Sequence, residues 1–327
     1  MKNFTYINAK SIKHAIESLG KDWNESVVKS GGTDLLGELK GLIISPEKVV
    51  NLKTIPGLDY IESTKDGGLK IGAMTTITKI SESSLIRTKF PVISQAASKV
   101  ASPQLRNMGT LGGNLCQRPR CWYYRENSIL CLKKGGSQCY AFTGENRFHC
   151  ILGGGPCFIV HPSDMAPSLI SCDAKIKIYG RKGERELELN NFYLLPKENI
   201  NRENVLNPDE IVTEIIIPPP QNNTKSIYVK QGIREAWDFA ICSVAISMST
   251  SGLKCENVRI VLGGAAPKPW RSIDTENELS GKIITEKVAE SAANATVNNA
   301  QNMRDNAYKI NLFRNIVKNA ILEVIKS

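Results

Sequence analysis

Six of the nine cysteines of this chain lie between residues 116 and 157, and this clustering restricts its folding more than any other feature. They are Cys116, Cys121, Cys131, Cys139, Cys150 and Cys157. The number of cysteines is odd, and the N-terminal residues lack the continuous apolar stretch of a signal peptide. A disulfide framework is therefore not expected, and the gathered thiols indicate a metal or cluster site.

The spacing of these cysteines favours an iron–sulfur cluster over zinc. A structural zinc site of cysteines normally uses two closely spaced pairs, and this segment does not contain two such pairs. Nine residues separate Cys121 from Cys131, seven more precede Cys139, and seventeen precede Cys157. Wide spacing on irregular backbone is compatible with four thiolates around a 4Fe-4S cluster. Spacing does not decide which four cysteines bind, and free cysteines packed as small apolar side chains are the alternative.

Basic residues are interspersed among these cysteines and would offset the negative charge of thiolates. They are Arg118, Arg120, Arg125, Lys133 and Lys134.

Two short glycine-rich segments share a similar pattern: SGGTDL at residues 30–35 and GTLGGN at residues 109–114. Consecutive glycines let successive backbone N–H groups converge on an anion, and Thr33, Thr110 and Asn114 add polar side chains. Two such segments facing each other would suit a diphosphate. Neither is a P-loop or a G-x-G-x-x-G fingerprint, so a Rossmann site is not supported. A structural turn is the alternative for each segment taken singly.

The remaining pattern predicts a mixed α+β protein of two domains. Its first part contains strand-like runs near residues 27–28, 49–52, 69–73, 174–180 and 211–217, and a helix from Pro91 to Ala101. The run Pro218-Pro219-Pro220 is the best domain boundary, which gives domains of residues 1–218 and 222–327. Three strand-like runs follow, at residues 226–230, 239–249 and 258–262, and an apolar stripe from Leu312 to Ile325 predicts a C-terminal helix.

Composition excludes several classes of protein. The net charge is +10 with a pI near 9.1, but the basic residues are scattered, so nucleic-acid binding is not expected. No apolar run is long enough to cross a membrane. We expect a cytoplasmic chain, unless a partner that carries a signal exports it.

Taken together, these motifs resemble the FAD-binding medium subunit of the xanthine dehydrogenase family of molybdenum hydroxylases. The resemblance covers essentially the whole chain and includes further motifs. They are IGA at 71–73, QLRNMGTLGGNL at 104–115, HPSDMAPSL at 161–169 and VLGGAAPKPWR at 261–271. It implies an FAD-binding domain of two subdomains, then a C-terminal domain with a three-stranded antiparallel sheet and helices.

The resemblance also implies which residues contact FAD. In this family the diphosphate lies along the two glycine-rich segments. Carried over by position, the contacts are Ser30, Gly31, Gly32, Thr33, Asp34, Leu35, Thr110, Gly112, Gly113 and Asn114. Asp164 in the HPSD run is a further polar contact, and Lys230 is expected near the flavin, with a solvated lysine as the alternative.

Residues 116–160 resemble an insertion that binds an extra 4Fe-4S cluster. It occurs in bacterial aldehyde oxidoreductases of the periplasmic type and in 4-hydroxybenzoyl-CoA reductase. Matched by position, the ligands are Cys121, Cys131, Cys139 and Cys157, whereas Cys116 and Cys150 are not ligands. Spacing alone would favour Cys150 over Cys157. His149 and His161 could form hydrogen bonds near the cluster, but an ordinary packed or solvated histidine is the better interpretation of each.

The function implied is electron relay through FAD. The partners would be a large molybdenum-cofactor subunit, a small subunit with two 2Fe-2S centres, and an external acceptor or donor. That external partner is unresolved among ferredoxin, quinone, NAD and oxygen. Alternatives are a 4-hydroxybenzoyl-CoA reductase-like complex running reductively, a stand-alone flavoprotein oxidoreductase, and a zinc-stabilised scaffold or nucleic-acid-binding module.

Overall fold

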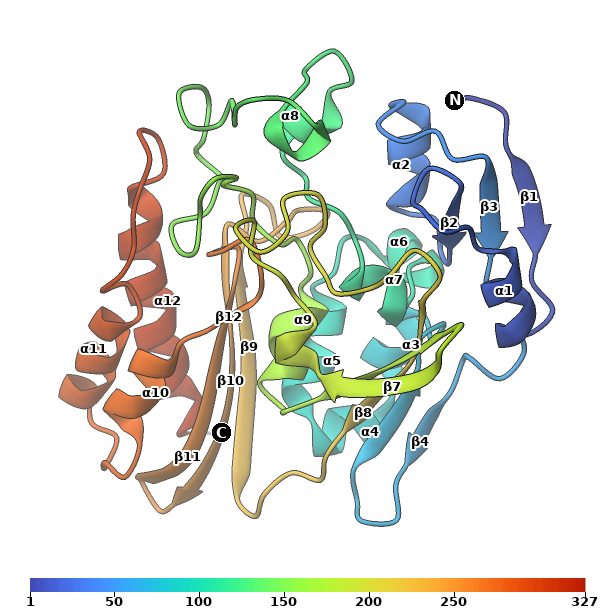
Figure 1. The fold of residues 1–327 in the computed structure, drawn as a ribbon. Helices are drawn as coiled ribbons and strands as arrows, with labels where there is room; N and C mark the ends of the chain where they lie inside the picture. Colours follow the sequence, from blue (N-terminus) through green and yellow to red (C-terminus); the bar gives the residue numbers. More distant parts are fainter. Residues whose placement is uncertain (327) are drawn as a thin grey trace.

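A small parallel sheet begins the chain in this computed structural model, which describes residues 1–326 (Figure 1). Its strand order is β1-β3-β2, and both pairings are parallel. The strands are β1 (Thr5–Asn8), β2 (Ser26–Lys29) and β3 (Lys48–Asn51), with helices α1 (Ile12–Ser18) and α2 (Leu35–Lys40). Ser11 caps α1 by accepting a hydrogen bond from the His14 N–H. Val50, Ala15 and Ile16 form part of this unit's core.

The second unit is built on an antiparallel sheet of order β4-β5-β8-β6-β7. Its strands are β4 (Ile61–Ser63), β5 (Leu69–Gly72), β6 (Lys175–Gly180), β7 (Gly183–Glu188) and β8 (Ile211–Ile217). Its helices are α3 (Ile77–Glu82), α4 (Ser84–Lys89), α5 (Pro91–Ser98), α6 (Pro103–Met108), α7 (Leu111–Leu115) and α9 (Met165–Ile170). Apolar side chains of β5, β6 and β8 pack with those of α3, α5 and α9 in one buried core. The second glycine-rich segment is not a free loop, because it forms α7 with Thr110 as its N-cap.

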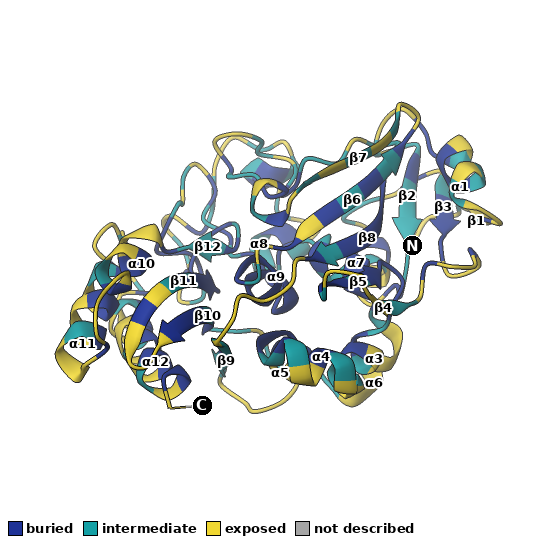
Figure 2. Cartoon of the chain, turned by 90° about the horizontal axis from the view of Figure 1, so that it is seen from below, coloured by how far each residue is buried: buried dark blue, intermediate teal, exposed yellow. Residues whose placement is uncertain are grey.

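The third unit packs three helices against an antiparallel sheet of order β12-β11-β10-β9. The elements are β9 (Thr224–Gln231), β10 (Cys242–Ser251), β11 (Lys254–Gly263), β12 (Trp270–Arg271), α10 (Ile273–Leu279), α11 (Glu286–Ala295) and α12 (Tyr308–Val324). Short β12 adds a fourth strand to the three that were predicted. The predicted stripe of α12 is buried at Phe313, Val317 and Ile321, while the outer faces of the helices are exposed (Figure 2).

The cysteine-rich segment connects α7 to α9 and contains little regular structure. It forms one short helix, α8 (Trp122–Arg125), and a 3-10 turn at Leu132–Lys134. Arg125 reaches the first unit, where its Nη2 lies 2.7 Å from Asp34 Oδ1. At its other end, the main-chain N–H of Ile151 donates to the carbonyl of Ala265, 2.9 Å away in the third unit. The segment therefore bridges the first and third units, above the sheets in Figure 1.

A buried lysine strengthens the second of these attachments. Lys309, at the start of α12, donates from Nζ to the carbonyls of Gly264 and His149, at 2.6 and 3.0 Å. Burial lowers the pKa of this ammonium to about 8. The third unit thus sets the position of residues near His149.

The strands and helices expected from the sequence pattern are present, and their ends differ from the expected ones by a few residues. For example, the helix predicted from Pro91 begins there and ends at Ser98, and β8 spans the predicted 211–217. No helix within residues 1–326 has both the length and the apolar character needed to span a membrane.

Candidate functional site

A cavity of about 500 Å³ separates the first unit from the second, and both glycine-rich segments line it. From the first segment it receives Ser30, Gly31, Gly32, Thr33, Asp34 and Leu35, and from the second Thr110, Gly112 and Gly113. The two segments are in close contact. A Cβ atom at Gly31 would overlap the carbonyl of Met108, and one at Gly113 would lie 2.5 Å from Ser30 Oγ. Only glycine permits this approach at residue 31.

The two segments differ in what their backbone offers to a ligand. The N–H groups of Leu111 and Gly112 donate to the carbonyls of Thr75 and Ala73 at the end of β5, and Gly113 N–H donates to Thr110 Oγ1. By contrast, the main-chain N–H groups of residues 31–34 donate to no acceptor within the part of the chain that the structure describes. Most amides of the second segment are therefore already bonded within the fold, whereas those of residues 31–34 remain available to an anion.

Cationic and aromatic side chains form the opposite wall of this cavity. Arg118, Lys133 and Arg202 line it together with Trp23, and the Arg202 guanidinium lies 3.5 Å from the centroid of the Trp23 ring. Such a wall suits a ligand that combines phosphates with a flat aromatic group.

Glu203 holds two of these cations in place from behind. Its carboxylate lies 2.8 Å from Arg118 Nε and 2.6 Å from Lys133 Nζ, and all three side chains are buried or nearly so. Burial alone would raise the pKa of the Glu203 carboxyl. The charges of Arg118 and Lys133 lower it by more, so the pKa lies below its ordinary value. Sequence reasoning missed Glu203, because its partners Arg118 and Lys133 lie far away along the chain and no local motif marks it.

Asp34 was predicted to contact FAD, and the structure gives its carboxylate another set of partners. It pairs with Arg120 at 2.8 Å and Arg125 at 2.7 Å, and accepts from the main-chain N–H of Arg118 at 2.7 Å. These partners belong to the cysteine-rich segment. Asp34 therefore fastens that segment to the first glycine-rich loop while it lines the cavity.

Asn114, Asp164 and Lys230 lie on the other side of the second segment. Asn114 and Asp164 line an adjacent cavity of about 220 Å³, which also contains Thr33 and Thr110. Asp164 accepts hydrogen bonds from Tyr228 Oη and Lys230 Nζ, both at 2.7 Å. Burial raises the pKa of Asp164, and Lys230 opposes that shift. Lys230 is thus not a solvated lysine, because its side chain is 8% exposed and paired.

The four predicted cluster ligands line one small cavity. Its walls contain Cys121, Cys131, Cys139 and Cys157, with Lys133, Tyr124 and His149. The neighbouring Cys157 thiol lowers the pKa of Cys139 to about 6. The volume is about 10 Å³, so the cavity has to widen to seat a four-iron cluster. In number and kind of donor, the set suits such a cluster.

The other two cysteines of the segment lie outside this cavity. Cys150 is buried, and its Sγ lies against Gly154 near Lys309, whose charge opposes the rise in the Cys150 pKa that burial causes. Cys116 lines the larger cavity between the glycine-rich segments. Among the described residues, no three His, Cys, Asp or Glu side chains are arranged to hold a single metal ion.

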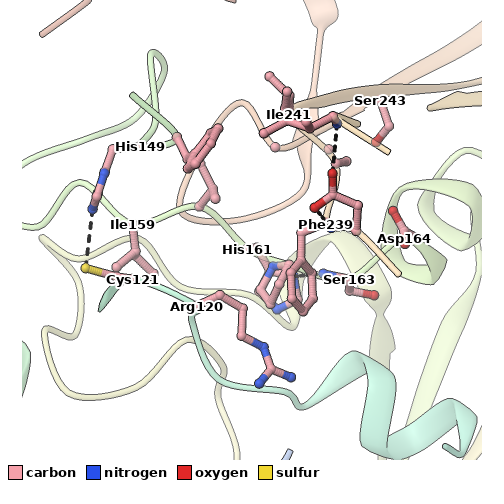
Figure 3. Close-up of a pocket in the computed structure, with 18 of the residues that line it drawn as sticks. Arg120, Cys121, His149, Ile159, His161, Ser163, Asp164, Phe239, Ile241 and Ser243 are labelled. Carbon is pink, nitrogen blue, oxygen red and sulfur yellow. Dashed lines mark hydrogen bonds between the residues drawn. The ribbon is translucent and has the colours of Figure 1, made fainter. Parts of the chain in front are cut away.

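A fourth cavity, of about 260 Å³, adjoins the cysteines and is shown in Figure 3. Cys121, His149, His161 and Asp164 are among the residues that line it. The ring of His161 packs edge-on against Tyr193 with centroids 4.7 Å apart, and its Nε2 has no partner within residues 1–326. The interpretation of His161 as a packed histidine agrees with this environment.

His161 is expected to make the protein sensitive to acid. Burial lowers its pKa from 6.5 to about 4, so between these values the unfolded chain binds a proton that the folded chain does not. The contribution of His161 to the free energy of unfolding should be fully present above pH 6.5. It should decrease by about 3 kcal/mol as the pH falls towards 4. Thermal unfolding of the wild type and His161→Leu across this range measures the effect. The variant should lose less stability on acidification, and equal losses would contradict the assignment.

Comparison with known proteins gives consistent matches over nearly the whole chain. Residues 2–220 match the family described as the FAD-binding domain in molybdopterin dehydrogenase, and residues 227–324 match the carbon monoxide dehydrogenase flavoprotein C-terminal domain.

Individual relatives and structures agree with these matches. The aldehyde oxidoreductase FAD-binding subunit PaoB of Escherichia coli K12 is 36% identical over 283 residues, 86% of this chain and 87% of the relative. The carbon monoxide dehydrogenase medium chain of Hydrogenophaga pseudoflava is 26% identical, over 97% of this chain and 96% of its own length. A solved structure of carbon monoxide dehydrogenase from the latter organism superposes with a TM-score of 0.79 at 24% identity, covering 99% of this chain and 98% of that one. The quinoline 2-oxidoreductase of Pseudomonas putida 86 gives a TM-score of 0.77 at 22% identity, over 100% and 99%.

Proposed function

Because this chain belongs to the family of FAD-binding medium subunits of xanthine and carbon monoxide dehydrogenases, we propose that it transfers electrons through FAD and one 4Fe-4S cluster. It is an FAD-binding oxidoreductase subunit, and the cluster and the relay are the proposal. One observation carries it: Tyr124 and Lys133 line both the glycine-rich cavity and the cysteine cavity. Two redox groups bound there would be separated by a single layer of side chains.

The residues of the larger cavity have separate roles towards FAD. The free N–H groups of residues 31–34 and the guanidinium of Arg118 would hold the diphosphate. The stacked pair of Trp23 and Arg202 offers an aromatic surface to a ring of the cofactor. Asp164 and Lys230 fix the wall of the adjacent cavity. When bound, FAD supplies the redox chemistry, while these residues orient it and exclude water.

The proposed cluster ligands are Cys121, Cys131, Cys139 and Cys157. Convergence of these four on one cavity supports this choice over a set that contains Cys150. Lys133, whose side chain is 2% exposed, places an ammonium group beside the thiolates and offsets their charge. In a 4Fe-4S cluster each thiolate binds a different iron, so the sulfurs stand farther apart than around a zinc ion.

We further propose that the chain works within a complex. The relatives are named as a FAD-binding subunit and a medium chain, which supports a large molybdenum subunit and a small subunit with two 2Fe-2S centres as partners. The substrate would bind the large subunit. The second candidate, from the resemblance of residues 116–160, is a reductive complex of the 4-hydroxybenzoyl-CoA reductase type.

Visible absorption of the purified chain, with assays of FAD, iron and acid-labile sulfide, tests the proposal. The expected result is flavin bands over a broad iron–sulfur absorption, with about four irons per chain. Flavin bands without iron or sulfide would exclude the cluster and leave an FAD subunit. A colourless protein that contains zinc would overturn both cofactor assignments, and substrate turnover by the chain alone would overturn the relay.

A further inference from the structure

Four cysteines line the small cavity, and one other side chain among the described residues forms a hydrogen bond to any of their sulfurs. It is the imidazole of His149. Its Nε2 lies 3.3 Å from Cys121 Sγ, and Figure 3 shows this contact as a dashed line. His149 is 3% exposed. Its Nδ1 has no partner within residues 1–326. A thiolate can only accept a hydrogen bond, so against a thiolate this contact requires the proton on Nε2, which then donates to the sulfur.

The position of this imidazole is set from outside the cysteine cavity. The carbonyl of His149 accepts from Lys309 Nζ at 3.0 Å and from Asn306 Nδ2 at 3.2 Å, and both donors belong to the third unit. Its main-chain N–H donates to the Asn146 carbonyl at 2.9 Å. The ring packs edge-on against Trp122, with centroids 5.4 Å apart. These contacts hold the donor while the cysteines themselves lie on irregular backbone.

The same contact separates two cavities. Cys121, His149 and Ile159 line both the cysteine cavity and the 260 Å³ cavity that contains Asp164 and His161. Because the imidazole is almost fully buried, its hydrogen bond has a larger electrostatic effect on the sulfur than the same bond would have in water.

We propose that His149 is a positioning residue that donates its Nε2–H to the Cys121 thiolate and raises the reduction potential of the cluster. This inference rests on the cluster assigned above. Reduction adds one electron to the cluster and makes its thiolates more negative, so an N–H donor stabilises the reduced form more than the oxidised form. No proton is transferred and no bond to His149 forms or breaks.

The test compares three variants of the purified chain with its cofactors bound. His149→Phe keeps a ring of similar size and removes the donor. His149→Gln retains an N–H donor. Tyr123→Phe is the matched control, because Tyr123 lines the same cavity and packs against His149, with ring centroids 6.3 Å apart. Its hydroxyl makes no hydrogen bond within the described residues. Iron and sulfide content are measured first, and the cluster potential is then obtained by redox titration followed by electron paramagnetic resonance.

The expected result is unchanged iron and sulfide in all three variants. In His149→Phe the ratio of reduced to oxidised cluster at a fixed solution potential should fall several-fold, with His149→Gln between it and the wild type. Tyr123→Phe should titrate like the wild type. A wild-type potential in His149→Phe would overturn the inference while leaving the cluster in place. Absence of iron from the wild type would instead overturn the cluster, and this inference with it.

Discussion

Replacing Cys121, Cys131, Cys139 or Cys157 by serine is expected to reduce the iron content of the purified chain from about four atoms to almost none. Thiolate ligation dominates the binding of a 4Fe-4S cluster, so the loss of one ligand should damage or remove it. FAD should largely remain, because the glycine-rich segments belong to other elements. Iron and acid-labile sulfide, expressed per FAD, measure the result.

Cys150→Ser is the matched control for these variants. Cys150 lies in the same segment and is buried, but it is not among the residues that line the cysteine cavity. The Cys150→Ser variant should retain about four irons per chain. Its free energy of unfolding should fall by about 1 kcal/mol because of altered packing. Loss of iron in Cys150→Ser, with iron retained in Cys157→Ser, would show that Cys150 is the fourth ligand.

Gly31→Ala should abolish stoichiometric binding of FAD. A methyl group at residue 31 would overlap the carbonyl oxygen of Met108, and backbone cannot move aside as a flexible side chain does. The first glycine-rich segment would be displaced from the second, and its free N–H groups would lose their position. Flavin released from the denatured protein, measured by absorbance against protein concentration, gives the FAD content.

Gly37→Ala provides the control for that change. Gly37 lies in α2, six residues further along the chain, and a Cβ there would have only Arg125 Nη1 nearby, at 3.9 Å. Alanine in a helix is favoured over glycine, so this variant should bind FAD fully and be slightly more stable. Full FAD content in a folded Gly31→Ala variant would contradict the role given to the close contact of the two segments.

Much of the architecture was predictable because it depends on local pattern. Alternating apolar residues in β6, the proline at the start of α5 and the apolar stripe of α12 each specify an element through nearby residues alone. The glycine-rich segments were equally visible, because adjacent glycines beside threonine form a compact local pattern. Strands β1, β4, β7 and β12 were missed; β7 contains mostly charged residues, and the other three are only two to four residues long, so each carries too little apolar pattern to identify a strand.

Other features depend on contacts between residues distant in the chain. The sequence suggested free amides in both glycine-rich segments, but in the second the N–H groups of Leu111 and Gly112 donate to the carbonyls of Thr75 and Ala73, which follow β5. Likewise, spacing placed Cys150 nearer to the other cysteines than Cys157, whereas only Cys157 lines their cavity. Neither outcome can be predicted from local pattern. The acceptor of a backbone N–H group and the direction of a side chain are fixed only when separate elements pack together.

By itself, the sequence determined the kinds of groups that this protein brings to its site: thiols, backbone amides and cations. Tertiary structure decided their partners. Asp34 pairs with arginines of the cysteine-rich segment, Glu203 holds Arg118 and Lys133, and His149 faces Cys121. The physical reason is that buried charges and hydrogen-bond donors must find partners inside the fold, and those partners come from elements that lie far apart in the sequence.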